Sequence, residues 1–273
     1  MDNAFFTHPI LNSPYDYPSR HWELDKDGQP TQRINEYRRN ADFITPIPKP
    51  RRQQRQDHQQ LPLVMDEGKG LSTEDQLYDP KGTINAVRKY VDEWRRIPDP
   101  NNWKVTPETA RLLEHWRHHQ FADVRPFFCQ IEAVETLIWL TEVAPKGGVK
   151  EKELLDVLSR ASTEANPGLE RIALKMATGS GKTTVMAMII AWQTINALRY
   201  PTSKKFTRGF LVVTPGITIR ERLQILLPNH PDNYYSNREL VPSDLLPELG
   251  KAKIVITNYH AFKLRERLEL SKG

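Results

Sequence analysis

The stretch MATGSGKT, residues 176–183, decides how the rest of this chain is interpreted. Gly179 and Gly181 allow backbone angles that other residues avoid and leave room for phosphate oxygens. Successive backbone N–H groups, with the N-terminus of a helix that begins near Lys182, would then bind an anion. The pattern predicts a Walker A loop in which two residues serve catalysis: Lys182 contacts the β- and γ-phosphates of ATP, and the Thr183 hydroxyl binds Mg²⁺. The predicted nucleotide-binding residues of the loop are Ala177, Thr178, Gly179, Ser180, Gly181, Lys182, Thr183 and Thr184.

The sequence on both sides of the loop fits this interpretation. Residues 172–176 form a short, mostly apolar run after the turn signal at 166–168 (NPG), and they predict a strand. Residues 184–198 contain no Gly or Pro and are apolar on nearly all sides, which predicts a buried helix. Met176 is a departure, because the strict pattern has Gly or Ala there. The alternative is a Gly-Ser turn with a chance lysine, and both flanks argue against it.

Two more apolar runs follow the loop and predict further strands. Residues 210–214 (FLVVT) stop at a Pro-Gly pair, and residues 254–257 (IVIT) form the next run. Helices are expected at 217–227 and, before the loop, around 131–139 and 154–158. Strands rich in β-branched residues that alternate with helices predict an α/β fold with a parallel sheet covered on both faces.

The N-terminal segment has a different composition. Residues 1–75 are rich in Pro, Gln, Asn, Asp and Arg, and alternating prolines at 46–50 (PIPKP) favour an extended, polyproline-type backbone. An excess of basic residues at 38–55 indicates either an arm that contacts phosphates or a solvated linker. These basic residues are Arg38, Arg39, Lys49, Arg51, Arg52 and Arg55, against the acid Asp42.

Residues 76–120 predict a helical region. Apolar residues recur at helical spacing over 84–94, and Pro98 ends that run. The triplet at 106–108 (TPE) then predicts an N-cap, a proline at the first helical position and an acid in the first turn.

His115 and His119 lie four residues apart on the second of these helices, beside His118. Two histidines at that spacing can share a metal ion. The zincin pattern needs a glutamate directly after the first histidine, and Trp116 occupies that position. We therefore interpret the histidines as part of a polar helix face, with a metal pair as the alternative.

The overall composition limits the class of protein. The 273 residues allow one or two domains, and a net charge of +5 with a pI of about 9.2 suits an acidic partner such as nucleic acid. With Cys129 as the one cysteine, neither a disulfide framework nor a cysteine zinc site can form. The N-terminus lacks a signal-peptide layout, and the longest apolar run, 186–192, is too short to span a bilayer. We expect a cytoplasmic protein without a membrane partner.

Four segments occur in an order that matches a known family. They are RPFFCQIEAVETLIWL from residue 125, MATGSGKT from 176, FLVVTPGITIRERL from 210 and KIVITNYHAF from 253. Over residues 125–270 this arrangement resembles the first RecA-like domain of superfamily-2 DEAD/DEAH-type helicases. More narrowly, it resembles the Res (restriction) subunit of type III restriction enzymes.

The resemblance implies roles for residues outside the loop. Gln130 stands where the family has a glutamine that reads the adenine edge, and an amide can both donate and accept there. Thr214 and Pro215, with Arg220, fall at the motif that contacts the nucleic-acid backbone, and Thr257 falls at a further such position. A purely structural role is the alternative for Arg220 and Thr257.

The resemblance also implies an activity. In the family, turnover of ATP with Mg²⁺ drives a helicase or translocase along duplex DNA, and a modification (methyltransferase) subunit is a candidate partner. Hydrolysis needs an Asp-Glu-x-His motif after the strand at 254–257 and a second RecA-like domain, and the sequence shows neither. The Asp-Glu pairs at 66–67 and 92–93 precede the loop, so they are not that motif.

We therefore expect residues 121–273 to form an incomplete first RecA-like domain, truncated before the acidic motif, that binds ATP and hydrolyses it negligibly. Two other functions stay open at this point. One is a non-catalytic remnant that binds DNA or docks a partner. The other is a different phosphate-loop enzyme, such as a small-molecule kinase.

Overall fold

The computed structural model describes residues 4–25, 27–41 and 80–262. The chain forms two compact units. The first contains Met1–Asn12, Pro18–Arg96 and Gly147–Ile172, and the second contains Ser13–Tyr17, Ile97–Lys146 and Ala173–Gly273. The alternating prolines, most of the basic residues of positions 38–55 and the Asp-Glu pair at 66–67 lie outside the described residues.

A hairpin that was not predicted lies in the N-terminal part of the first unit. Its turn is stabilised by the Asp25 carboxylate, which accepts hydrogen bonds from the N–H groups of Asp27 and Gln29 at 2.9 and 2.8 Å. Gly28 adopts a φ of +79°, a conformation that favours glycine, and the Asp-Gly pair was the available sequence signal. The elements of the first unit are α1 (Ala4–Thr7), β1 (His21–Leu24), β2 (Pro30–Asn35), α2 (Pro80–Arg95) and α5 (Val149–Ala165).

Both long helices predicted for this part of the chain are present. On α2 the apolar residues at helical spacing, Val87, Val91 and Trp94, are buried, whereas Ile84 at the start of the run is 38% exposed. On α5 the leucines at 154, 155 and 158 are half-buried. The 3.6-residue period of the sequence was therefore sufficient to identify both helices.

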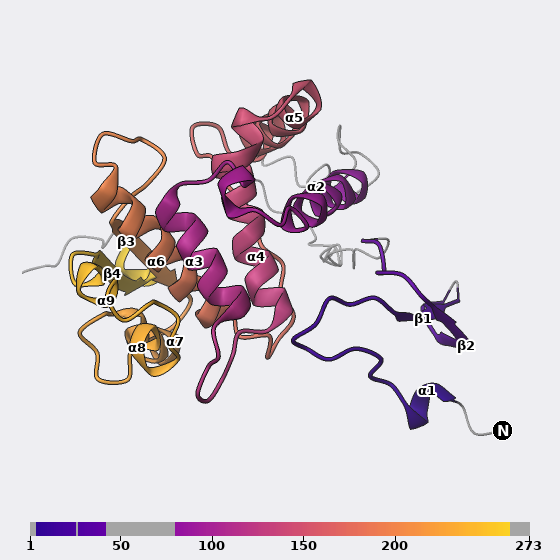
Figure 1. Cartoon of the computed structure of the whole chain (residues 1–273). Coiled ribbons are helices and arrows are strands. Elements are labelled where there is room, and N and C mark those ends of the chain that lie inside the picture. The colour runs from indigo at the N-terminus through magenta and orange to yellow at the C-terminus, as the bar shows by residue number, and fades with distance from the viewer. Residues whose placement is uncertain (1–3, 26, 42–79, 263–273) are drawn as a thin grey trace, which may run out of the picture. The chain divides into compact units, whose positions relative to one another are not determined.

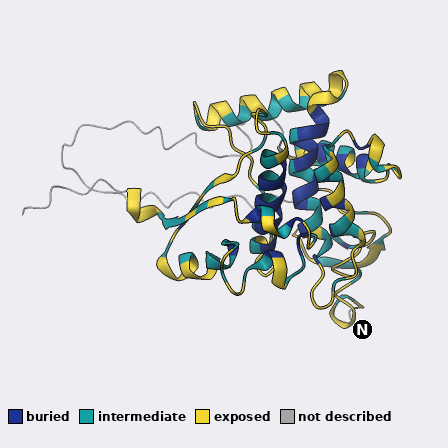
Figure 2. Cartoon of the chain, turned by 60° about the vertical axis from the view of Figure 1, so that its left-hand side comes forward, coloured by how far each residue is buried: buried dark blue, intermediate teal, exposed yellow. Residues whose placement is uncertain are grey.

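Three helices form the centre of the second unit: α3 (Pro107–His118), α4 (Phe128–Ile138) and α6 (Lys182–Arg199). They lie side by side in Figure 1, and buried residues gather on the central helices in Figure 2. The predicted buried helix at 184–198 is thus confirmed as α6. The other elements of the unit are η1 (Pro100–Asn102), a π-helical turn η2 (Trp139–Val143), η3 (Ala144–Lys146), β3 (Gly209–Thr214), α7 (Ile217–Arg222), η4 (Leu223–Leu226), α8 (Tyr234–Asn237), α9 (Leu246–Leu249), β4 (Lys253–Asn258) and η5 (Tyr259–Phe262).

A buried polar network joins these helices. The Thr106 side chain caps α3, as predicted, by accepting a hydrogen bond from the Thr109 N–H at 3.1 Å. The Glu142 carboxyl group, 2% exposed, accepts hydrogen bonds from the Thr109 hydroxyl at 2.7 Å and the Trp192 indole at 2.8 Å. Its other oxygen accepts from the Thr106 backbone N–H at 2.8 Å. Because a buried polar group is costly unless it is hydrogen-bonded, this network fixes how α3 and η2 meet α6.

The sheet of the second unit is smaller than predicted. Strands β3 and β4 pair in parallel, with Phe210 opposite Ile254 and Val213 opposite Thr257, so two of the predicted strands are confirmed. The prediction of a third strand at residues 172–176 is wrong, because no strand is assigned there and Ile172 is 58% exposed. A strand is stabilised by the neighbour with which it pairs, and no described residue pairs with this run.

The prediction that helices cover both faces of this sheet is also wrong. Leu211, Val213 and Val255 are 59%, 48% and 58% exposed, and they lie on one face because side chains alternate along each strand. The opposite face, which carries Val212 and Ile256, is half-buried. The second unit is therefore a mixed α/β structure with a small parallel sheet and flanking helices.

Candidate nucleotide-binding site

The phosphate loop has the backbone geometry that its glycines predict. Gly179 has a φ of +81° and Gly181 a φ of +75°, both in the region that favours glycine. Helix α6 begins directly afterwards, at Lys182, and the Gly181 carbonyl accepts its first hydrogen bond, from the Thr184 N–H at 2.9 Å. The loop thus leads into the N-terminus of an 18-residue helix, where the helix dipole favours a bound anion.

Gln130 on α4 holds this loop from the side. The side chain is 4% exposed, and its Nε2 donates to the Ser180 carbonyl at 2.9 Å. Its Oε1 accepts from the Phe127 backbone N–H at 3.0 Å, within the first turn of α4. A Cβ atom added to Gly181 would overlap with the Gln130 amide, so position 181 needs glycine for its backbone angle and for this contact.

Lys182 and Thr183, the residues predicted to contact phosphates and Mg²⁺, are the first two residues of α6. The Lys182 side chain is exposed, and its Nζ donates to the carbonyl of Ala177, at the start of the loop, at 2.7 Å. Thr183 is half-buried and lines the pocket beside the loop. Mg²⁺ is usually bound by one or two protein oxygens together with phosphates and water, and the Thr183 hydroxyl fits that donor set. Within residues 4–25, 27–41 and 80–262, no three His, Cys, Asp or Glu side chains come together as an independent metal site.

A pocket of about 210 Å³ opens beside the loop. Five of the predicted nucleotide-binding residues line it, and no acidic side chain does. Arg125, Tyr234 and Arg238 also line it, and sequence reasoning did not find them because no local motif marks these positions. The five predicted residues in the lining are Gln130, Gly179, Gly181, Thr183 and Thr184.

A segment from the N-terminal part of the chain supports the pocket wall. The Pro14 carbonyl accepts a hydrogen bond from the Phe128 N–H at 2.9 Å, where α4 begins. The Tyr15 ring lies 5.4 Å from the Phe127 ring, and the Arg125 guanidinium lies over Tyr15 at 4.3 Å. These contacts fix the turn that carries Gln130 into the pocket.

A comparison with known protein families identifies the family of this chain. A family model described as "Type III restriction enzyme, res subunit" matches residues 123–272. The chain belongs to this family. No curated protein and no solved structure matches the chain. The matched range includes Gln130, the phosphate loop and both strands of the parallel sheet. The described helices of this res-family chain include none that is long and apolar enough to cross a membrane.

The residues predicted to contact nucleic acid lie at one end of the res-family sheet. Thr214 ends β3 and Thr257 lies one residue before the end of β4. Thr214 is 2% exposed, and its hydroxyl has two carbonyl acceptors within reach for its single proton, Gly216 at 3.0 Å and Thr257 at 3.3 Å. Pro215 is exposed and Arg220 on α7 is half-buried. The structure therefore brings Thr214 and Thr257 together, away from the lining of the nucleotide pocket.

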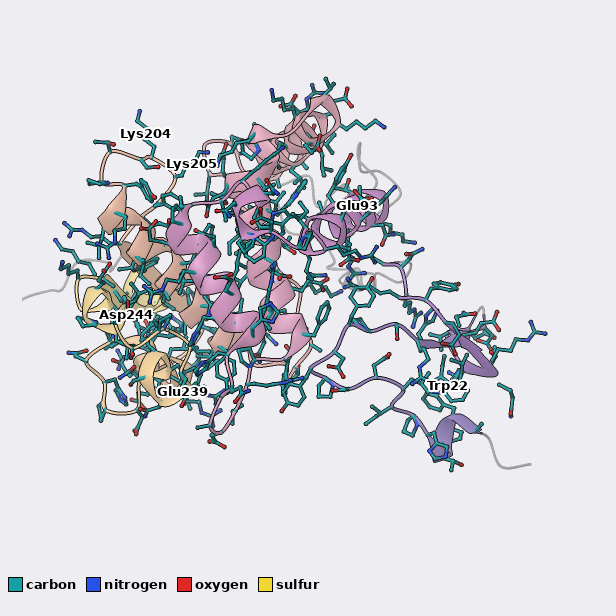
Figure 3. All side chains as sticks on the ribbon, viewed as in Figure 1. Trp22, Glu93, Lys204, Lys205, Glu239 and Asp244 are labelled. Atoms are coloured by element: carbon teal, nitrogen blue, oxygen red, sulfur yellow. The ribbon has the colours of Figure 1, made fainter. Side chains whose placement is uncertain are left out.

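The histidines of α3 bind a segment far along the chain. His115 Nε2 donates to the Glu239 carbonyl at 2.6 Å, and His119 Nε2 lies 3.0 Å from the Glu239 carboxylate. The two imidazole rings stack at 4.3 Å. Glu239, labelled in Figure 3, also accepts from the Ala122 N–H at 3.2 Å. We call His115, His119 and Glu239 the histidine clamp.

Electrostatic effects in the histidine clamp act on two groups. Burial lowers the pKa of His115 below its ordinary value, and the nearby His119 lowers it further, although the hydrogen bond to Glu239 opposes both effects. The Ala122 N–H and the His119 side chain lower the pKa of the Glu239 carboxyl group. The clamp therefore favours a neutral His115 and an ionised Glu239.

Proposed function

We propose that the second unit binds Mg-ATP through residues 177–184, as the nucleotide-binding part of an ATP-dependent helicase or translocase that acts on duplex DNA. The observation that carries this proposal is the backbone of the loop. Gly179 and Gly181 both have positive φ angles directly before the N-terminus of α6 at Lys182. In such an arrangement, backbone N–H groups of the loop and of the helix N-terminus would bind a phosphate. Family membership supports a helicase-like, restriction-enzyme context, and we propose a RecA-like fold for residues 121–273.

Lys182 would exchange partners when a nucleotide binds. Its ammonium group now donates to a neutral carbonyl, that of Ala177. A phosphate oxygen carries negative charge, so it is the stronger acceptor and would draw Nζ toward the β- and γ-phosphates. The Thr183 hydroxyl would hold Mg²⁺, which neutralises charge on the phosphate oxygens when it is bound.

Gln130 has two roles in this proposal. It holds the loop through the Ser180 carbonyl. An amide group has two N–H donors and an oxygen with two lone pairs, so each end of Gln130 keeps one further hydrogen-bonding position. Those positions would serve the adenine edge, which is the role implied by the resemblance to helicases.

We propose that the second unit holds nucleotide without rapid turnover. Phosphoryl transfer in phosphate-loop enzymes uses an aspartate for Mg²⁺, a residue that orients the attacking water and an arginine finger worth about 10³- to 10⁵-fold in rate. The pocket lining contains no acidic side chain that would hold the ion or orient water. ATP binding and ATP hydrolysis are therefore separate measurements for this protein.

We also propose that the end of the sheet near Thr214, Pro215 and Thr257, with Arg220 on α7, contacts the phosphate backbone of duplex DNA. The exposure of Pro215 and the closeness of the two threonines support this assignment. The half-buried Thr257 hydroxyl and the Arg220 guanidinium suit contacts that do not depend on base sequence, whereas the buried Thr214 would position this end of the sheet. The modification (methyltransferase) subunit is the proposed protein partner, on family membership alone.

The nucleotide site is tested by titrating the protein with Mg-ATP and measuring the affinity by calorimetry. We expect Lys182→Ala to weaken ATP binding at least tenfold, since hydrogen bonds to charged groups contribute about 1.5–3 kcal/mol. The matched control is Lys204→Ala, which removes an exposed lysine from the loop between α6 and β3 (Figure 3). Equal ATP affinity in Lys182→Ala and the unmodified protein would contradict the assignment of this nucleotide site.

The second candidate function is a non-catalytic module that binds DNA or docks a partner. DNA affinity that is unaffected by ATP, together with unchanged ATP affinity in Lys182→Ala, would favour it. A small-molecule kinase is the third candidate, and DNA-dependent ATP binding would argue against it.

A further inference from the structure

Arg238 reaches the phosphate loop from a segment 54 residues further along the chain. Its Nη1 lies 3.3 Å from the Thr184 hydroxyl, on the first turn of α6 directly after Lys182 and Thr183. Arg238 also lines the same pocket as Gln130 and Gly181. A guanidinium group is thus present where the loop, the helix N-terminus and the pocket meet.

The guanidinium is held in place without being neutralised. It lies over the Tyr234 ring at 4.0 Å from the centroid, which is a cation–π contact. In the part of the chain that the structure describes, no carboxylate lies within ion-pair distance of Arg238, and no acid lines the pocket. Since the guanidinium has five N–H donors and the Thr184 hydroxyl occupies one, several donors are left for an anion.

The backbone that follows Arg238 is fixed on the helical core. Glu239 has a φ of +49°, an uncommon conformation for a residue other than glycine. Its carbonyl binds His115 on α3, and its carboxylate binds His119, which caps the end of α3. The next carbonyl, that of Leu240, accepts from the Trp116 indole at 2.8 Å. A strained residue that is held by so many partners indicates a position that the fold maintains.

We infer that Arg238 is a phosphate-binding residue of the nucleotide site and contacts the α-phosphate of a bound nucleotide. The inference rests on the proposed function, because it places Arg238 in the same site as Lys182. Arg238 shares its pocket with Gln130, the residue assigned to the base, whereas Lys182 does not line that pocket. The same pocket contains Thr183, the residue assigned to Mg²⁺, and Arg238 contacts the neighbouring Thr184. We therefore place Arg238 between the base and the metal, at the α-phosphate, and Lys182 at the β- and γ-phosphates. A planar guanidinium can donate two parallel hydrogen bonds to phosphate oxygens, which fits this role.

The test measures affinity for ATP, ADP, AMP and adenosine in the full chain, by calorimetry with displacement titrations for the weaker ligands. We expect Arg238→Ala to weaken ATP, ADP and AMP binding about 10- to 100-fold and to leave adenosine binding unchanged. Arg238→Lys keeps the charge without the planar fork, so its loss should be smaller. The control Arg111→Ala removes a half-exposed arginine that pairs with Asp244 at 2.7 Å, outside the pocket lining, and should change no affinity.

Each outcome decides the inference. Unchanged ADP and AMP binding in Arg238→Ala overturns it, and so does an equal loss for adenosine, which would indicate a role in shaping the base pocket. Weaker DNA binding with unchanged ADP binding also overturns it, because the guanidinium would then serve nucleic-acid phosphates. Lys182→Ala, measured in parallel, separates this inference from the proposed function. If Lys182→Ala weakens ADP binding and Arg238→Ala does not, the inference alone fails. If neither variant does, the loop is not the nucleotide site.

Discussion

The Gln130 amide donates to the Ser180 carbonyl at 2.9 Å and thereby joins the first turn of α4 to the phosphate loop. In the sequence these residues belong to two separate motifs, 50 residues apart. In the structure they form one unit, because the Gln130 amide occupies the space that a side chain at Gly181 would need. The candidate nucleotide site is therefore built by packing of α4 against α6 as well as by the loop itself.

Gly181→Ala should damage both stability and nucleotide binding. A positive φ costs a residue with a Cβ atom about 1–3 kcal/mol, and the new Cβ would also displace the Gln130 amide. Gly179→Ala is the matched comparison, since Gly179 has a similar φ of +81° but open space around it. Urea unfolding should show a larger loss for Gly181→Ala. Adding Gln130→Ala to Gly181→Ala should restore the steric part of that loss, and full additivity of the two changes would contradict this account.

Arg220→Ala should weaken DNA binding uniformly across DNA sequences. If Arg220 contacts one backbone phosphate, its removal should reduce the slope of log affinity against log salt by about 1. The measurement is a fluorescence-anisotropy titration at several salt concentrations, with Arg111→Ala as a control that keeps the same net charge as the variant. A slope equal to that of the control would show that Arg220 is a structural residue.

Glu142→Ala should be among the most destabilising single changes in the second unit. It would leave the Thr106 N–H and the Thr109 hydroxyl without their carboxyl acceptors, whereas the Trp192 indole keeps the Thr109 hydroxyl as an acceptor at 3.1 Å. Each buried donor left unsatisfied costs about 1–3 kcal/mol, so we expect a loss of about 2 kcal/mol or more in the free energy of unfolding. Glu221→Ala, at an exposed position on α7, should change it by less than about 0.5 kcal/mol. A loss for Glu142→Ala as small as this control would mean that the network contributes little.

Sequence reasoning succeeded where a short-range rule is sufficient. The start of α6 at Lys182 and the Thr106 cap of α3 each depend on a few neighbouring residues, and both predictions are confirmed. The strand at 172–176 was predicted by the same kind of local pattern and is wrong. A strand also needs a partner, and its own sequence does not say whether one is present.

The same limit explains which site residues were missed. Arg238 enters the pocket because Glu239 and Leu240 are bound by side chains of α3, more than a hundred residues earlier in the chain. His115 and His119 could be recognised as a pair by their spacing, but their shared partner, Glu239, could not be found from α3 alone. Long-range contacts of this kind leave no local pattern.

The histidine clamp should make stability depend on pH. The pKa of His115 is lowered in the folded protein, so the unfolded chain takes up a proton first as the pH falls. The contribution of His115 is therefore fully present above its ordinary pKa of 6.5 and is lost as the pH falls through the lower folded value. The stacked His119 ring, 4.3 Å from the His115 ring, is among the groups that lower the pKa of His115. The contribution of His115 to the free energy of unfolding should thus decrease between neutral and mildly acidic pH.

His115→Gln tests this assignment, because a glutamine amide can donate to the Glu239 carbonyl but does not titrate. Urea unfolding at intervals from pH 7.5 to about pH 5 should show a smaller decrease in stability for His115→Gln than for the unmodified protein. His118→Gln is the control: it changes a neighbouring histidine of α3 for which the structure records no clamp contact. An ion pair that needs a protonated histidine would behave in the opposite way: its contribution to the free energy of unfolding would increase as the pH falls. Equal pH profiles for His115→Gln and His118→Gln would show that His115 is not the group responsible, and that other groups produce any decrease seen in this range.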